Sequence, residues 1–133
     1  MGKTNEIILD SNVILRFLIK DNSYHFIEAE KLIKKIAQKK IFGLISVLVI
    51  NEMLWILKTY YHIEKNVYIP QILKLIALEN IEIIEVSKDM LIKSLQQFQI
   101  KNLDFTDIYL FTIAEGKEIF SFDQDLRKLQ KSH

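Results

Sequence analysis

Short apolar runs alternate with longer stretches of helical periodicity along this chain, and that order limits the folds open to it. The apolar runs at 6–9, 41–45, 81–86 and 118–122 are predicted to be β-strands. Between and after them, apolar residues recur at helical spacing, which predicts helices at 12–19, 24–38, 47–59, 66–78, 88–99, 105–115 and 124–129. The chain therefore reads as strands separated by one or two helices.

Residues that commonly begin or end helices support these boundaries. Ser23, Ser46, Ser87 and Asp104 each precede a predicted helix, and we expect them to be N-caps. Gly116 follows the helix at 105–115, where a glycine readily takes the left-handed conformation that ends a helix.

The order of elements predicts an α/β fold. Strands joined through helices pair in parallel, and strands with helices on both faces are continuous apolar runs, as Ile-Ile-Leu at 7–9 is. We expect a three-layer α/β/α sandwich around a short central parallel sheet. No linker or repeat interrupts residues 1–133, which indicates a single domain. Ligands of open parallel sheets bind at the carboxyl ends of the strands, so the site is expected there.

Composition excludes several classes of protein. The chain has no cysteine, which excludes disulfides, thiolate metal sites and cysteine nucleophiles. Its longest apolar stretches, such as 47–50 and 54–57, fall far short of the ~20 residues of a membrane span. The first residues lack the pattern of a signal peptide. We expect a cytoplasmic protein without membrane association.

The basic residues are evenly balanced by acids but unevenly distributed. The formal net charge is +1, which does not by itself indicate a nucleic-acid-binding protein. However, five lysines fall within ten residues, in the second half of the predicted helix at 24–38 and just after it: Lys31, Lys34, Lys35, Lys39 and Lys40. Two interpretations remain open, the solvated face of an amphipathic helix or a surface that follows phosphates.

Four carboxylates lie inside apolar segments, where an ionised group without a partner costs several kcal/mol. They are Asp10, Glu52, Asp107 and Asp123. Asp10 and Asp123 directly follow predicted strands, and Glu52 and Asp107 lie on helices that can present them at the same sheet edge. Arg16 is the only arginine among the first 126 residues, so basic partners are few. Converging acids without counter-charges favour a divalent cation, and oxygen ligands select Mg²⁺ or Mn²⁺.

Each acid also has a purely structural interpretation. Asp10 and Asp123 can cap the helices that follow them, and Asp107 can favour the positive end of its own helix together with Asp104. Glu52 can be an exposed position of a helix that is less buried than its sequence indicates. The four acids in one consistent arrangement are harder to explain in this way.

The segments that carry these acids resemble those of PIN-domain ribonucleases, and in size the chain is similar to the VapC-type toxins of toxin–antitoxin pairs. The matching pieces are ILDSNV at 8–13, the helix start at 46–52 with Asn51-Glu52-Met53, LDFTDI at 103–108 and IFSFDQDL at 119–126. Ser11 and Ser121 stand where many relatives have threonine, so the hydroxyl is kept at both positions.

The resemblance implies a Mg²⁺- or Mn²⁺-dependent endoribonuclease that hydrolyses RNA phosphodiester bonds. Asp10, Glu52, Asp107 and Asp123 would be catalytic and would ligate metal directly or through water. Asn12 and Ser121 would orient these groups, and Asp104 and Asp125 would be further acids at the rim. The partners implied are an RNA substrate and a cognate antitoxin protein.

Other interpretations of the acids, of one helix and of the fold are also possible. The acids can be structural, which would make the chain a catalytically inactive PIN-like binding module. The helix at 66–78 carries more apolar residues than one face needs, which indicates a homodimer seam, a groove for a partner helix, or burial in the core. A receiver domain needs an acidic pair after its first strand and an aspartate after its third, but here the first strand gives one aspartate and the third runs into Ser87 and Lys88. A haloacid-dehalogenase phosphatase needs a second aspartate two residues after the first, where this chain has Asn12.

Overall fold

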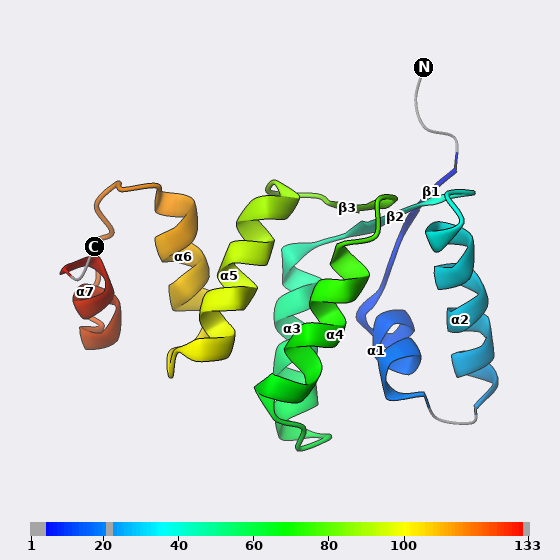
Figure 1. Ribbon diagram of the computed structural model, residues 1–133. Helices are drawn as coiled ribbons and strands as arrows, with labels where there is room; N and C mark the ends of the chain where they lie inside the picture. Colours follow the sequence, from blue (N-terminus) through cyan, green and yellow to red (C-terminus); the bar gives the residue numbers. More distant parts are fainter. Residues whose placement is uncertain (1–4, 21–22, 132–133) are drawn as a thin grey trace.

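The computed structural model describes residues 5–20 and 23–131 and contains both strands and helices (Figure 1). Within these residues the elements are, in chain order, β1 (Glu6–Ile8), α1 (Ser11–Ile19), α2 (Tyr24–Ala37), β2 (Phe42–Ile45), α3 (Val47–Thr59), α4 (Lys65–Ile76), β3 (Ile81–Ile83), α5 (Lys88–Ile100), α6 (Phe105–Ala114) and α7 (Gln124–Lys131). Every helix expected from the sequence is present, with ends within one or two residues for most.

The predicted serine caps begin their helices as expected. The side chain of Ser23 accepts a hydrogen bond from the backbone N–H of Phe26 at 3.1 Å. Ser46 accepts from Leu48 at 3.1 Å, and Ser87 accepts from Met90 at 3.2 Å. Each cap satisfies one of the backbone donors that the first turn of a helix leaves unpaired.

The sheet is parallel, with β2 between β1 and β3. The α/β class is therefore confirmed. Both crossovers run in the same direction across the sheet, and right-handed crossovers of that kind place their helices on one face. Figure 1 shows α1 to α4 below the strands in that view.

Burial alternates along β2 and β3 in agreement with this arrangement, whereas all three residues of β1 are exposed. On the covered face, Leu9, Ile45 and Ile81 are buried. On the opposite face, Ile8, Leu44 and Glu82 lie side by side in the register of the sheet and are more exposed. One face of the sheet is therefore more deeply covered than the other within a single chain.

The prediction of a fourth strand at 118–122 is wrong. This segment has no regular secondary structure, and β1 pairs only with β2 among the described residues. A strand needs a neighbour for its backbone groups, and α6 packs on α5 beyond the β3 edge, which keeps the segment away from β1 (Figure 1). The side chain of Gln130 instead bonds both the N–H and the carbonyl oxygen of Ile119. The third strand is also shorter than predicted, because pairing ends at Ile83.

The core lies between the sheet and the helices beneath it. Ile36, Ile50, Met53 and Ile69 are among its fully buried side chains. Most apolar residues of α4 lie in this core. Burial in the core therefore accounts for most of the apolar surplus that the sequence shows in this helix. Among the helices described, none combines the length and the apolar character that a membrane crossing requires.

Candidate functional site

Asp10 and Glu52 are connected through the serine between β1 and α1. Asp10 follows Leu9 at the carboxyl end of β1, and its carboxylate accepts a hydrogen bond from the backbone N–H of Ser11 at 2.8 Å. The buried hydroxyl of Ser11 donates to the carboxylate of Glu52 on α3. The structure thus places these two predicted site residues at the same end of the sheet.

Asp107 lies among three further carboxylates. Partial burial raises the pKa of Asp107, and the negative charges of Asp123, Asp104 and Asp125 raise it further. The carboxylate of Asp123 accepts hydrogen bonds from the backbone N–H groups of Asp125, at 2.8 Å, and Leu126, at 3.1 Å. The structural interpretation of Asp123 as a helix cap is therefore correct, and this cap also contributes charge to the cluster.

A cavity of about 1160 Å³ joins Glu52 to this aspartate cluster. Glu52 and Asn51 line it from α3, and the four aspartates line it from the starts of α6 and α7: Asp104, Asp107, Asp123 and Asp125. Asp10 is not among the residues that line it. Across residues 5–20 and 23–131, no three acidic or histidine side chains come close enough to hold a metal ion. The acids therefore fall into two groups, Asp10 with Glu52 and the cluster around Asp107.

The two residues predicted to orient the acids lie in different places. The hydroxyl of Ser121 accepts a hydrogen bond from the backbone N–H of Asp123 at 2.9 Å, so it shapes the loop that presents this carboxylate. Asn12 is exposed on α1 and lines a separate groove between α1 and α2.

Glu85 is a further acid at this end of the sheet that the sequence analysis missed. Its carboxylate accepts hydrogen bonds from the hydroxyl of Ser46 and from the backbone N–H of Val47, the latter at 2.8 Å. Partial burial acts to raise the pKa of Glu85, but these hydrogen bonds and one from its own backbone together hold it below the ordinary value. The predicted strand at 81–86 included Glu85, and only the earlier end of β3 at Ile83 shows that this acid, like Asp10, follows a strand.

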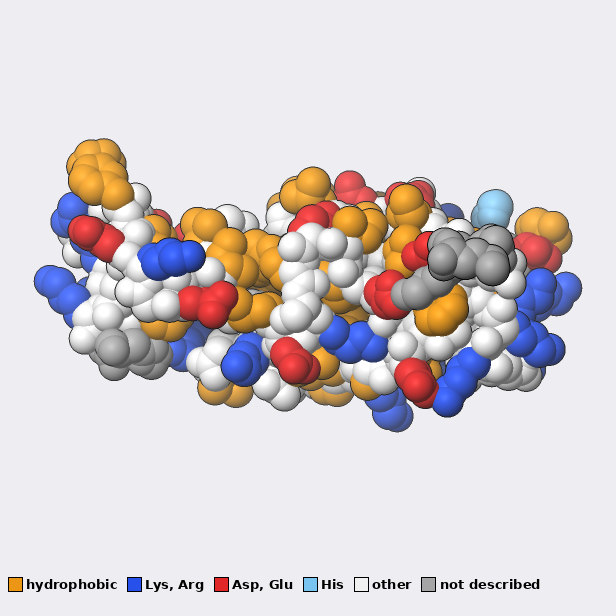
Figure 2. All heavy atoms as spheres, turned by 90° about the horizontal axis from the view of Figure 1, so that it is seen from above, with side chains coloured by type: hydrophobic (Ala, Val, Ile, Leu, Met, Phe, Trp, Pro, Cys, Tyr) orange, Lys and Arg blue, Asp and Glu red, His pale blue; other side chains and the backbone are white. Residues whose placement is uncertain are grey.

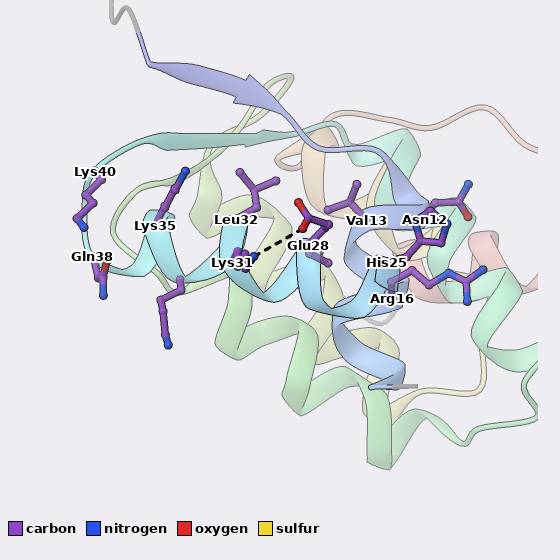
Figure 3. Close-up of a pocket in the computed structure, with 12 residues that line it drawn as sticks. Asn12, Val13, Arg16, His25, Glu28, Lys31, Leu32, Lys35, Gln38 and Lys40 are labelled. Carbon is purple, nitrogen blue, oxygen red and sulfur yellow. Dashed lines mark ion pairs between the residues drawn. The ribbon is translucent and has the colours of Figure 1, made fainter. Parts of the chain in front are cut away.

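The groove between α1 and α2 is basic. It has a volume of about 750 Å³ and is lined by Arg16 from α1 and by lysines that include Lys31, Lys34 and Lys35 from α2. Figure 3 shows Asn12 and Arg16 at one end of the groove and Lys35 and Lys40 at the other. Lys31 forms an ion pair with Glu28 at 3.8 Å. Four of the five lysines therefore line a hollow, which begins beside the helix start that Asp10 caps, whereas Lys39 forms an ion pair with Glu79.

Comparisons with known proteins give two matches. The family model described as PIN domain matches residues 7–132, a range that includes Asp10, Glu52, Asp107 and Asp123. The chain is also 31% identical, over 112 residues, to the protein named Ribonuclease VapC2 of Methanocaldococcus jannaschii, and the match covers 67% of this chain and 68% of that protein. No solved structure matches significantly.

Proposed function

The chain belongs to the PIN-domain family, and from this premise we propose that it is an endoribonuclease that hydrolyses RNA phosphodiester bonds with Mg²⁺ or Mn²⁺. The observation that carries the proposal is that Glu52 and four aspartates line one cavity. Uncompensated carboxylates repel one another, as the raised pKa of Asp107 indicates. A hard divalent cation would relieve that repulsion.

The proposal assigns the acids as the sequence predicts. Asp10, Glu52, Asp107 and Asp123 are the proposed catalytic and metal-binding residues, with Asn12 and Ser121 as orienting groups and Asp104 and Asp125 at the rim. Carboxylate oxygens suit Mg²⁺ and Mn²⁺. However, although these acids line one cavity, no three of them among the described residues lie close enough to hold a metal ion, so we assign no reaction step to a metal.

The basic groove supports RNA as the substrate. Arg16, Lys34 and Lys35 line a hollow that begins near Asp10, and cations arranged along a groove attract the phosphates of a nucleic-acid strand. Figure 2 shows Lys and Arg side chains gathered at the end of the molecule that α2 occupies. This distribution favours the phosphate-following interpretation of the lysines.

A toxin role in a type II toxin–antitoxin pair is the finer part of the proposal. It is supported by the similarity to a relative whose name is Ribonuclease VapC2. The protein would act in the cytoplasm and be held inactive by a cognate antitoxin protein. Co-purification of the product of a short neighbouring reading frame, with loss of RNA cleavage in the complex, would support this role.

The nuclease function is tested by incubating the purified protein with single-stranded RNA in Mg²⁺, in Mn²⁺ and in chelator. We expect cleavage with either metal, none in chelator, and a loss of at least about 100-fold in Asp107→Asn. Asp89→Asn, an exposed acid on α5 outside the cavity, is the matched control and should keep full activity. Equal cleavage by wild type and Asp107→Asn would contradict the proposal.

The alternative is a catalytically inactive PIN-like binding module with structural acids. It is favoured by the separation of Asp10 from the aspartate cluster. In that case Asp107→Asn stabilises the fold and leaves RNA binding unchanged, and no metal supports cleavage.

A further inference from the structure

Lys65 is the first residue of α4, where its charge is unfavourable for its own helix. The N-terminus of a helix carries a partial positive charge, so a cation placed there is repelled. The start of α4 also lacks a side-chain cap, because Glu64 at the N-cap position makes no capping hydrogen bond. A residue that breaks a local rule in this way is expected to act through a contact elsewhere in the molecule.

That contact is with the end of α5. The ammonium group of Lys65 donates to the carbonyl oxygens of Phe98 and Lys101, at 2.8 Å each, and lies 4.3 Å from the centre of the Phe98 ring. The last turn of α5 has no basic residue of its own, and the carbonyl groups at a helix C-terminus are stabilised by a cation. Lys65 therefore caps a helix that lies more than thirty positions away in the sequence.

The end of α5 in turn holds the start of α6. The ring of Phe98 packs edge to face on that of Phe105, with centroids 5.8 Å apart, and Phe105 stacks on Tyr109 at 5.9 Å. Phe105 is the first residue of α6 and is buried, whereas Asp104 at the N-cap makes no capping hydrogen bond with its side chain. The ring contacts, rather than a side-chain cap, therefore fix where α6 begins.

Asp104 and Asp107 lie at this helix start. Both line the same cavity as Lys65 and Phe98. The largest influences on the pKa of Asp107 are its burial and the charges of neighbouring aspartates. The effect of Lys65 on this carboxylate therefore passes through the placement of α6 rather than through the charge of the ammonium group itself.

Lys88 makes the corresponding contact at the opposite end of the two helices. It is the first residue of α5, and its ammonium group donates to the carbonyl of Leu78, just after α4, at 2.8 Å. Burial lowers the pKa of Lys88 as it lowers that of Lys65. Lys88 does not line the cavity. In Figure 1, α5 lies between α4 and α6. The two lysines thus join the same helices, but only the contact of Lys65 continues into α6.

We propose that Lys65 is a positioning residue of the aspartate cluster, which fixes the start of α6, and with it Asp107, through the rings of Phe98 and Phe105. Two of the three N–H donors of its ammonium group are occupied by the carbonyl oxygens of α5, so its main role is to hold the protein rather than to bind RNA. The consequence for cleavage rests on the proposed function, but the placement of α6 does not.

Amide NMR of the full chain tests the placement without any measurement of activity. Lys65→Met removes the charge and the donors at nearly constant length, so it should change the amide chemical shifts of residues 104–109 and speed their hydrogen exchange. Lys88→Met, the matched control, should leave these amides as in wild type. Unchanged amides in a folded Lys65→Met variant, or equal changes in both lysine variants, would overturn the proposal.

A second variant keeps the test decisive if Lys65→Met does not fold. Phe98→Leu retains an apolar side chain but removes the ring that contacts both the ammonium group and Phe105. It should therefore change the amides of residues 104–109 in the same way. Wild-type amides in Phe98→Leu would break the proposed chain of contacts and overturn it.

Cleavage kinetics then separate positioning from substrate binding. Lys65→Met should lower kcat by at least about tenfold, because a small displacement of a reacting group is costly, and should leave KM within about twofold of wild type. A raised KM with an unchanged kcat would mean that Lys65 binds RNA directly and would overturn the positioning role. Failure of the wild type itself to cleave would instead contradict the proposed function, and the amide measurements would still decide the placement of α6.

Discussion

The hydroxyl of Ser11 and the carboxylate of Glu52, 41 positions apart in the sequence, form a hydrogen bond that joins the start of α1 to the middle of α3. Ser11 is itself buried, whereas Glu52 is exposed, so the bond is only partly shielded from water. It sets the position of Glu52 relative to Asp10, the residue before Ser11. The relative placement of these two acids therefore depends on a neutral side chain.

Replacing Ser11 tests this dependence. Ser11→Ala removes the donor to Glu52 and should reduce the free energy of unfolding by about 1 kcal/mol. It should also lower RNA cleavage, because Glu52 is no longer held in place. Ser11→Thr keeps the hydroxyl and should restore cleavage, and chemical denaturation together with an RNA cleavage assay checks both. Equal cleavage by the alanine and threonine variants would show that the bond has no role in the site.

Divalent metal should stabilise the protein through the aspartate cluster. A ligand that binds only the folded state stabilises by mass action, about 2.7 kcal/mol at a hundred times its Kd. Thermal melts should therefore shift upward in Mg²⁺ or Mn²⁺. Asp107→Asn should remove that shift and, without metal, raise the melting temperature by on the order of 1–3 °C because charge repulsion is relieved in a partly exposed setting. The same metal-induced shift in Asp107→Asn as in wild type would place the metal elsewhere.

The lysines of the α1–α2 groove should contribute to RNA affinity in a salt-dependent way. Lys34→Gln with Lys35→Gln should weaken RNA binding several-fold at low salt and reduce the slope of log affinity against log salt by about 1 to 1.5. Fluorescence anisotropy with a labelled single strand measures both. Lys93→Gln, an exposed lysine of α5 outside the groove, is the matched control. A double variant with an unchanged salt slope would identify these lysines as an ordinary solvated helix face.

Glu85 should make stability pH-dependent in the acid range. Its folded pKa lies below the ordinary value of 4.5, so its contribution is fully present above that pH and is lost as the pH falls through the folded pKa. Glu85→Gln should cost a few tenths to about 1 kcal/mol at pH 7, because the side chain is largely exposed. The difference from wild type should shrink below pH 4. Denaturant melts from pH 3 to 7 measure it, and a difference that stays constant with pH would contradict the assignment.

Gly43 leaves little room for a side chain, and the ends of two buried isoleucines would have to move to admit one. A Cβ at this position would lie 2.7 Å from the Cδ1 atom of Ile36 and 2.9 Å from that of Ile81. Gly43→Ala should therefore destabilise the protein by about 1–3 kcal/mol through overpacking at the centre of the sheet. Gly116→Ala, where no atom lies near the added Cβ, is a comparison in which only the positive φ is strained. Equal costs for the two variants would contradict the packing argument.

Local sequence signals predicted most of the fold. Ser23, Ser46 and Ser87 cap the helices that they were expected to cap, because capping depends on residues within one turn. The segment 118–122 has the composition of a strand, but strand formation also needs a partner in space. Composition could not indicate that α6 would hold this segment away from β1.

At the site, too, local signals were predictable from the sequence and contacts between distant residues were not. The sequence identified acids at strand and helix ends, and the structure brings Glu52, Asp107 and Asp123 around one cavity. The sequence alone could not predict that Asp10 would lie outside the cavity lining, because that depends on which strand neighbours β1. The hydrogen bonds from Ser46 and Val47 to Glu85 could not be predicted from the sequence either, because they join residues nearly forty positions apart.

The amide of Gln130, which bonds Ile119 through both its oxygen and its nitrogen, has a consequence for how far assembly can go. A β-segment open on both sides can add a chain to each and grow into a fibre. With one side occupied by its own helix, the 118–122 segment can pair with one neighbouring chain at most. Removal of this amide would make polymerisation, rather than loss of folding, the failure to look for.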